Sequence, residues 1–357
     1  MRMSRSNSNL YFSSEAFVFD WSKFAPRRSL ICLPAVAVAI FGSLAAHHAG
    51  AGLIAGGGAV SVGFGSFHRI QNSRVAPMLL ASIGMFASTF VGTIAGHRLT
   101  ILVSVAALWG FSYGLLAAVG ADARCVGLQC VIVMLVSSGY PQPLGHAAIR
   151  AFLILGGGLL QTLFITLLRF AGPVKLHELA LPKELGSRVF LPVAHIIEQN
   201  LTISSEVFQY GLRLAVTLAI TAGAARYLSL MDGYWAPMTA LLVLKPDVPQ
   251  TLVRGTARIV GTLAGAALAT VIAVAVRPAI VTVALLVIFF AWLGYSVLNV
   301  NYATYVLTVT AYVVFLLALG GLSEINVVKF RAIHTVFGGA IALFAYALWP
   351  VKSRNVS

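Results

Sequence analysis

Residues 279–298 read AIVTVALLVIFFAWLGYSVL and contain no charged side chain. A helix of this length is about 30 Å long, which matches the hydrocarbon core of a bilayer, so the stretch predicts a transmembrane helix. Similar apolar stretches lie on both sides of it, at roughly 30–48, 50–67, 76–96, 99–121, 125–140, 148–168, 211–230, 233–246, 256–276, 302–319 and 330–350. We therefore expect an all-α polytopic membrane protein with about 12 transmembrane helices, although 125–140 and 233–246 are short for a full crossing.

The composition also indicates a bilayer environment. Of the 357 residues, 59% are hydrophobic and only 10% are charged, and the mean hydropathy is +0.92. A soluble domain has about a quarter of its residues charged, because its surface must be hydrated. The net charge of +14 flanks the apolar stretches and is not gathered on one polar domain. It therefore favours contact with anionic lipid over nucleic-acid binding.

The distribution of Lys and Arg predicts the orientation of the chain. With a cytoplasmic N-terminus and twelve spans, 18 of the 24 Lys and Arg residues lie inside. The six that remain outside are Arg98, Arg150, Arg226, Arg277, Lys329 and Arg331. Positive residues in short loops concentrate on the cytoplasmic side, so we expect both termini in the cytoplasm.

The two halves of the chain share a sequence pattern. Arg150-Ala151, followed by three glycines, recurs 181 residues later as Arg331-Ala332 followed by two glycines, and Arg74 and Arg254 are 180 residues apart. Two halves of six spans insert the same way up, which gives a parallel repeat of the kind found in transporters, although simple gene fusion gives the same pattern. The predicted parts are a cytoplasmic segment 1–29, a six-helix half 30–170, a cytoplasmic linker 171–208, a six-helix half 209–351 and a cytoplasmic tail 352–357.

Glycines recur at four-residue spacing within several of the apolar stretches. The pairs are Gly92/Gly96, Gly110/Gly114 and Gly261/Gly265. In lipid, helices associate through close backbone approach, which small residues allow. We expect tight helix packing at these positions, and the same faces would permit a homo-dimer.

The most informative segment is residues 233–247, GYWAPMTALLVLKPD, followed at 254–265 by RGTARIVGTLAG. It resembles the signature of the fusaric-acid-resistance and aromatic-acid-exporter family of membrane proteins. The resemblance implies a bacterial inner-membrane transporter that exports small organic, often aromatic, acids, and by family alone an envelope efflux companion. It is specific to the second half. The larger exporters carry a sizeable cytoplasmic domain between their halves, whereas here about 38 residues separate them.

The signature supplies the candidate substrate-binding residues. Arg254 and Arg258 are four residues apart and share a helix face, where two guanidinium groups can hold a carboxylate. Lys245 precedes them, and Tyr234 and Trp235 offer flat surfaces to an aromatic ring. The alternative is structural, because arginines at helix ends reach lipid phosphate and Trp and Tyr form interfacial belts.

Three further arginines lie inside or at the start of apolar stretches, namely Arg213, Arg150 and Arg331. Inserting a charge at the centre of a membrane helix costs about 2.5–3.5 kcal/mol, so such residues usually face a protein interior or an aqueous cavity. We include Arg213 among the predicted substrate-binding residues.

No carboxylate lies in the middle of an apolar stretch, where ion-coupled carriers commonly place one. The predicted coupling residues are therefore Asp232 and Asp247, which border the signature, and His334 in the last stretch. A hydrogen-bonded structural histidine is the alternative for His334. Asn301, beside Tyr302, could line a polar path or simply form a turn.

We expect export of small organic, chiefly aromatic, acids. A passive organic-anion channel or uniporter is an alternative, which the missing mid-membrane acid and the family's kinship with plant malate transporters favour. A non-transporting accessory subunit or scaffold is another. An enzyme is not expected, because the histidines are scattered and the sequence has no HExxH or P-loop pattern. The three cysteines have no metal or disulfide spacing, so we expect no cofactor and no metal.

Overall fold

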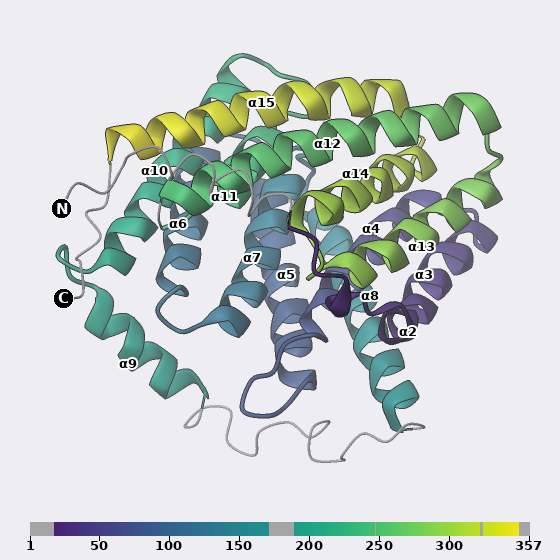
Figure 1. Ribbon diagram of the computed structural model, residues 1–357, viewed down its shortest axis with the longest axis horizontal. Helices are drawn as coiled ribbons and strands as arrows, with labels where there is room; N and C mark the ends of the chain where they lie inside the picture. Colours follow the sequence, from purple (N-terminus) through teal and green to yellow (C-terminus); the bar gives the residue numbers. More distant parts are fainter. Residues whose placement is uncertain (1–17, 171–188, 247, 322–323, 350–357) are drawn as a thin grey trace. The chain divides into compact units, whose positions relative to one another are not determined.

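The computed structural model describes residues 18–170, 189–246, 248–321 and 324–349 (Figure 1). In this part of the chain the only regular elements are helices, apart from one isolated bridge between Ile70 and Ser73. The prediction of an all-α protein is confirmed. The predicted tail 352–357 and most of segment 1–29 lie outside the described residues.

The described residues form two compact units. The large unit, Leu30–Met238, contains eight α-helices. They are α3 (Leu33–Ala45), α4 (Ala49–Gly65), α5 (Val75–Ala95), α6 (Leu99–Leu115), α7 (Ala121–Ser138), α8 (Leu144–Phe170), α9 (Leu191–Asn200) and α10 (Glu206–Tyr227). In this unit α4 packs against α3 and α8, α5 packs against α7 and α8, and α6 packs against α10.

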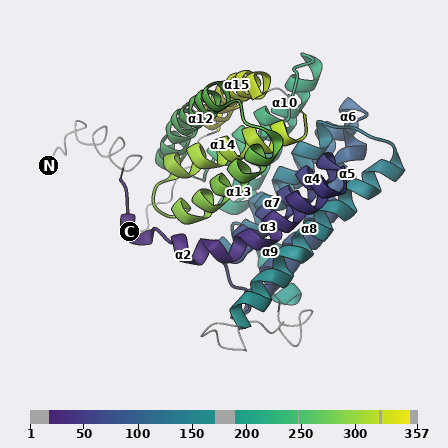
Figure 2. The same ribbon diagram turned by 90° about the vertical axis from the view of Figure 1, so that its right-hand side faces the viewer.

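The second unit, here called the signature unit, combines the described residues of Met1–Ser29 with those of Thr239–Ser357. Its elements are η1 (Trp21–Lys23), α2 (Pro26–Ser29), α12 (Val248–Val276), α13 (Ile280–Val297), α14 (Tyr302–Leu319) and α15 (Glu324–Leu348), while α11 (Trp235–Val243) begins in the large unit and ends in this one. Within the signature unit α12 packs against α14 and α15, and both views show α15 beside α12 (Figures 1 and 2).

Nine helices of the described chain are long and apolar enough to cross a membrane. They are the helical run Trp21–Ala45 and helices α5, α7, α8, α10, α12, α13, α14 and α15. Helices α4 and α6 are apolar but have only 17 residues each. The chain is therefore a multi-pass membrane protein, as predicted, whereas the count of twelve stays a prediction.

The two short stretches behave differently. Helix α7 has 18 residues and qualifies as a span. Helix α11 has nine residues, which extend only about 13 Å at 1.5 Å per residue, so it cannot cross a bilayer alone. Pro237 is tolerated in its first turn, and Pro246, three residues beyond its end, disfavours a helical conformation at Lys245.

The predicted glycine contacts are confirmed in both units. A Cβ on Gly92 or Gly96 would overlap backbone carbonyl groups of α7, and a Cβ on Gly261 or Gly265 would overlap carbonyl oxygens of α14. Gly114 lies against the backbone of Gly211 in α10. These glycines let helix backbones approach closely, which fixes the face that α12 turns toward α14.

The described part of the predicted linker contains α9, whereas residues 171–188 lie outside the described residues. Residues 18–29 pack with the signature unit, about 210 residues earlier in the sequence than the rest of that unit. The compact units follow helix packing, and the predicted division into two six-helix halves stays a prediction.

Candidate functional site

One face of α12 carries three polar side chains, Arg254, Arg258 and Thr262, which we call the α12 stripe. With 3.6 residues per turn, positions four apart differ by about 40°, so the three lie within an arc of about 80°. Gly261 and Gly265 fall in the same region of the helix and lie against α14. The stripe therefore runs along the edge of the α12–α14 contact.

The first residue of α14 contacts the first residue of the stripe. The guanidinium carbon of Arg254 lies 4.0 Å from the centre of the Tyr302 ring. A cation over an aromatic face at this distance is held by about 0.5–2 kcal/mol, depending on its exposure to water. Tyr302 also lies 6.3 Å from Tyr305, measured between ring centres. The contact fixes Arg254, which is half-buried, beside the start of α14.

Several polar atoms around the stripe lack hydrogen-bond partners. The side chain of Arg258 is 4% exposed and Thr262 is fully buried. Arg258 Nε, Thr262 Oγ1 and the Tyr302 hydroxyl have no hydrogen-bond partner among the described residues. Leaving a buried polar group unpaired costs about 1–3 kcal/mol, and more for a charged one. A buried cation and two buried hydroxyl groups are thus available to a ligand that offers acceptor atoms.

Lys245 lies at the beginning of α12. Its backbone N–H donates to Thr251 Oγ1 at 3.1 Å, and the Thr251 hydroxyl donates to the Lys245 carbonyl at 3.4 Å. Thr251 is buried and precedes Arg254 by one helical turn. The paired bonds hold the backbone of Lys245 near the N-terminal end of the stripe, and its side chain is half-buried.

Tyr234 and Asp232 belong to a separate cluster in the large unit, which we call the loop cluster. The Tyr140 hydroxyl lies 3.0 Å from the Tyr234 hydroxyl and donates to Asp232 Oδ1 at 3.5 Å. Arg150 Nη1 donates to the Tyr140 carbonyl at 2.6 Å, with its guanidinium carbon 5.3 Å from the Tyr140 ring centre. The cluster joins the α7–α8 loop to the α10–α11 loop.

Packing holds this cluster together. A Cβ on Gly139 would overlap the Tyr234 ring, so only glycine leaves room for that ring. The ring of Tyr234 lies 4.9 Å from Trp235, and both residues are 5% exposed. Tyr234 and Trp235 thus contact each other, and Tyr234 also contacts the α7–α8 loop, which favours a structural role over a freely accessible aromatic surface.

Burial and charge act on Tyr140, which lies between two candidate spans. Its pKa is raised above the ordinary value, mainly because burial disfavours the phenolate and also because Asp232 carries negative charge. The hydrogen bond with Tyr234 and the charge of Arg150 act in the opposite direction. Tyr140 is therefore a neutral hydrogen-bond donor at neutral pH. Asp232 itself has φ of 53°, a left-handed conformation that aspartate tolerates better than most residues.

The remaining predicted residues are buried elsewhere. Arg213 is 1% exposed, and its guanidinium carbon lies 5.8 Å from the Tyr210 ring centre. Arg331 is 2% exposed, and its Nη2 donates to Thr310 Oγ1 at 3.2 Å. Both side chains are thus buried within the protein, whereas Arg150 is half-buried, and binding of substrate by Arg213 stays a prediction.

His334 is 1% exposed and stacks on Phe330 at 6.4 Å between ring centres. Asp247 lies outside the described residues. Within the described parts of the chain, no three His, Cys, Asp or Glu side chains are placed to hold a metal ion.

The sequence prediction missed Thr262, Tyr302 and Tyr140. The sequence contains a pattern that predicts Thr262, since this residue continues the four-residue spacing of Arg254 and Arg258. No local pattern predicts Tyr302 and Tyr140, because their contacts join different helices or loops. For Asn301 the sequence allows either a polar path or a turn. The structure shows that it caps α14, with its Oδ1 accepting from the N–H groups of Ala303 and Thr304.

Comparison with known proteins adds the following relatives. A Neisseria gonorrhoeae protein described as Uncharacterized protein ORF2 is 28% identical over 155 residues, which is 43% of this chain and 37% of that protein. The Inner membrane protein YccS of Escherichia coli K12 is 28% identical over 155 residues, 43% of this chain and 21% of YccS. A Haemophilus influenzae protein is 24% identical over 159 residues, 44% of this chain and 22% of that protein. This chain thus spans less than two fifths of the length of these relatives.

No solved structure matches this chain. The family described as fusaric acid resistance protein-like matches residues 218–345, which include the α12 stripe and Tyr302. The resemblance predicted from the signature is therefore confirmed: residues 218–345 of this chain match the family described as fusaric acid resistance protein-like.

Proposed function

We propose that this protein is an inner-membrane transporter that exports small organic acids, chiefly aromatic ones, and that the α12 stripe binds their carboxylate group. The observation that carries the proposal is Arg258: its side chain is buried, and its Nε has no acceptor among the described residues. A guanidinium group binds a carboxylate through charge-assisted hydrogen bonds, which are about twice as strong as neutral ones. An anion at the stripe would supply the missing acceptor.

The groups around Arg258 fit a carboxylate. A buried charge is costly unless it is paired, and pairing Arg258 with an anion removes that cost. The hydroxyl groups of Thr262 and Tyr302 have no hydrogen-bond partner among the described residues, and the proposal assigns both to the same ligand as donors. Arg254, already held over the Tyr302 ring, adds positive charge at the entrance of the stripe. The Tyr302 ring itself offers an apolar edge to an aromatic acid.

The segment that matches the family supports a transport function for this protein and a location in the inner membrane. The stripe lies within residues 218–345, and a relative that matches 43% of this chain is named an inner membrane protein. By the charge distribution, both termini and the start of α12 lie on the cytoplasmic side, so the stripe would receive its anion from the cytoplasm.

Contacts between loops support alternating crossings in the large unit. His68, in the α4–α5 loop, pairs with Asp122 at the start of α7 at 2.7 Å. His97, in the α5–α6 loop, bonds the carbonyl of Gln142 in the α7–α8 loop at 3.0 Å. Each contact joins loops separated by two helices, as expected if α5, α6 and α7 all cross. We therefore include the 17-residue α6 among the proposed spans.

Helix bounds support the proposed parallel repeat. The starts of α7 and α14, Ala121 and Tyr302, are 181 residues apart, and each helix has 18 residues. The starts of α6 and α13, Leu99 and Ile280, show the same separation. In each half the fifth helix packs closely on the third through glycines, α5 with α7 and α12 with α14.

Passive conduction is the second candidate. Among the described residues no carboxylate lies in the interior of a candidate span, so a proton carrier in the middle of the membrane is not supplied by Asp or Glu there. Asp232 in the loop cluster, His334 in α15 and Asp247, which lies outside the described residues, stay the proposed coupling residues. Efflux that continues without a pH gradient would favour the passive route.

The test is efflux of labelled benzoate from cells that express the protein, measured at matched membrane abundance. Arg258→Gln should reduce the initial rate at least tenfold, because one buried charge-assisted interaction is lost. The control is Arg277→Gln, which removes an exposed arginine at the other end of α12 and should leave the rate unchanged. Equal rates for wild type and Arg258→Gln would refute the role of the stripe.

A further inference from the structure

The N-terminal segment, residues 18–29, is built into the signature unit by hydrogen bonds to the end of α13 and the start of α14. The backbone N–H of Asp20 donates to the Val300 carbonyl at 3.0 Å, and that of Ala25 donates to the Ser296 carbonyl at 3.2 Å. Trp292 Nε1 donates to the Pro26 carbonyl at 3.1 Å. These bonds join residues more than 260 positions apart in the sequence.

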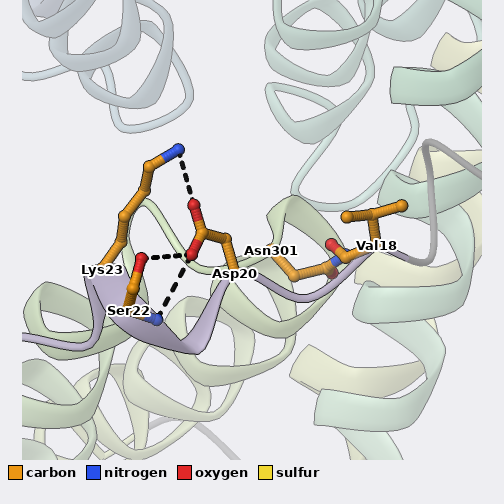
Figure 3. A network of polar contacts seen from close by, with 5 residues as sticks. All are labelled: Val18, Asp20, Ser22, Lys23 and Asn301. Carbon is orange, nitrogen blue, oxygen red and sulfur yellow. Dashed lines mark hydrogen bonds and ion pairs between the residues drawn. The ribbon is translucent and has the colours of Figure 1, made fainter.

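The fourth bond reaches the cap of α14. Asn301 Nδ2 donates to the Val18 carbonyl at 3.0 Å, and Figure 3 labels both residues. The Oδ1 of the same amide accepts from two N–H groups in the first turn of α14, at 2.8 Å from Ala303 and 3.2 Å from Thr304. One side-chain amide therefore binds both the N-terminal segment and the first turn of α14, and it is 7% exposed.

The segment also has its own internal order. Asp20 pairs with Lys23 at 3.0 Å and accepts from the Ser22 N–H at 3.2 Å, which folds the chain into the short turn η1 (Figure 3). The ion pair is exposed and contributes little by itself. It fixes the local shape, so that the backbone groups of Val18 and Asp20 both point to the α13–α14 turn.

The residue that follows Asn301 is Tyr302, whose ring lies under Arg254. A shift of the first turn of α14 would move this ring and with it the guanidinium group. We propose that residues 18–29 act as a clasp that positions Tyr302, and through it Arg254, for anion binding. Asn301 and Trp292 are the positioning residues. The inference rests on the proposed function of the α12 stripe.

Asn301→Ser separates the clasp from the cap. Serine still caps a helix, because its hydroxyl oxygen accepts from the N–H groups of the first turn, but it cannot donate from an amide to Val18. Asn301→Ala removes both roles. Trp292→Phe keeps an aromatic ring in α13 and removes only the donor to Pro26. Trp109→Phe, which removes a comparable bond to Ser88 in the large unit, is the matched control.

Two measurements on the full-length protein in lipid nanodiscs or vesicles test the proposal. The first is hydrogen exchange of the peptide that covers residues 299–306. Trp292→Phe and Asn301→Ser should each raise its exchange rate by about threefold or more, and Trp109→Phe should not. The second is the concentration dependence of benzoate transport, in which both clasp variants should raise KM severalfold with the maximal rate less affected. A purely structural defect would instead lower abundance or the maximal rate.

The outcomes separate the clasp from the proposed function. Unchanged exchange in both variants would overturn the clasp, whatever transport does. Faster exchange with an unchanged KM would overturn the positioning of the anion site. If the wild type moves no organic anion, the proposed function fails, and the exchange data alone then decide whether the segment holds α14. Asn301→Ser should not raise KM further when Arg254→Gln is already present, because the effects of two residues that act through one contact are not additive. An equal increase of KM in that background would contradict a route through Arg254.

Discussion

Arg254 and Tyr302 form the contact that links the two helices of the proposed anion site: the guanidinium carbon lies 4.0 Å above the centre of the ring. The two residues are separated by 48 positions and by the whole of α13, so the contact depends on the packing of α12 against α14. It joins a charged group to an aromatic face, and the Tyr302 hydroxyl has no hydrogen-bond partner in the described parts of the chain.

Two substitutions at Tyr302 separate the roles of its ring and its hydroxyl. Tyr302→Phe keeps the aromatic face, so the melting temperature in detergent should stay within experimental error while benzoate affinity falls. Tyr302→Leu also removes the cation–π contact and should lower the free energy of unfolding by about 0.5–2 kcal/mol. If Tyr302→Phe destabilises the protein as much as Tyr302→Leu does, the hydroxyl is structural and is not reserved for a ligand.

The close contact of α12 with α14 should depend on Gly261. A Cβ there would meet the Ala303 carbonyl oxygen and the Val306 side chain, and backbone cannot move aside cheaply. Gly261→Ala should therefore cost about 1–3 kcal/mol of stability through overpacking. Gly339→Ala in α15 is the control, since a Cβ at that position would have no neighbour within 4 Å. Thermal unfolding in detergent measures both. Equal melting temperatures for Gly261→Ala and Gly339→Ala would show that α12 and α14 can move apart without loss of stability.

Much of the fold could be predicted from apolar stretch length alone. All twelve predicted stretches contain a helix, and for 302–319 the predicted bounds coincide with those of α14. The hydrophobic pattern could not decide whether 233–246 crosses, because crossing depends on where the helix ends, and Pro246 ends it early. It could not place residues 18–29 in the signature unit either, since their partners are backbone carbonyls and an amide near residue 300.

The loop cluster should respond to alkaline pH. Burial raises the pKa of Tyr140, and the negative charge of Asp232 adds to this, whereas Tyr234 and Arg150 oppose it. The unfolded chain loses the phenol proton near pH 10 but the folded chain keeps it. The stability that Tyr140 contributes is thus fully present below pH 10 and is lost as pH rises through its folded pKa.

Tyr140→Phe should accordingly flatten part of the decline in melting temperature above about pH 10. Other tyrosines also titrate in this range, so the quantity to measure is the difference from wild type at each pH. Tyr227→Phe is the control, because Tyr227 is 81% exposed. If the melting temperature of Tyr140→Phe falls with pH in parallel with that of wild type, ionisation of Tyr140 does not affect the stability of the loop cluster.

The candidate site was predictable only in part, for a physical reason. Helical spacing places Arg254 and Arg258 on one face from sequence alone, and Thr262 extends that face. Tyr234 and Trp235 were predicted to face a substrate ring from their residue type. Their contacts with each other and of Tyr234 with Tyr140 arise from the meeting of two loops, which no local pattern specifies.

The sharpest prediction concerns the stability of Arg258 variants. If Arg258 were a structural residue with a buried partner, its removal would leave that partner uncompensated and cost about 3–5 kcal/mol. If it awaits a ligand, as we propose, Arg258→Met replaces a buried guanidinium group, whose Nε has no acceptor among the described residues, by an apolar side chain of similar length. The variant should then melt at the same temperature as wild type or higher, because replacing buried charges by apolar residues is often neutral or stabilising.

The same variant should lose its response to ligand. Benzoate at 100 times its dissociation constant should stabilise wild type by about 2.7 kcal/mol, since a ligand that binds only the folded state shifts the unfolding equilibrium by mass action. Arg258→Met should show no benzoate-dependent rise in melting temperature, whereas Arg277→Met, at an exposed position, should respond like wild type. A destabilised Arg258→Met that still responds to benzoate would assign Arg258 to the scaffold. A stable Arg258→Met variant that does not respond to benzoate would show that Arg258 binds the anion. Such a residue is needed for the ligand, whereas its buried charge lowers the stability of the fold.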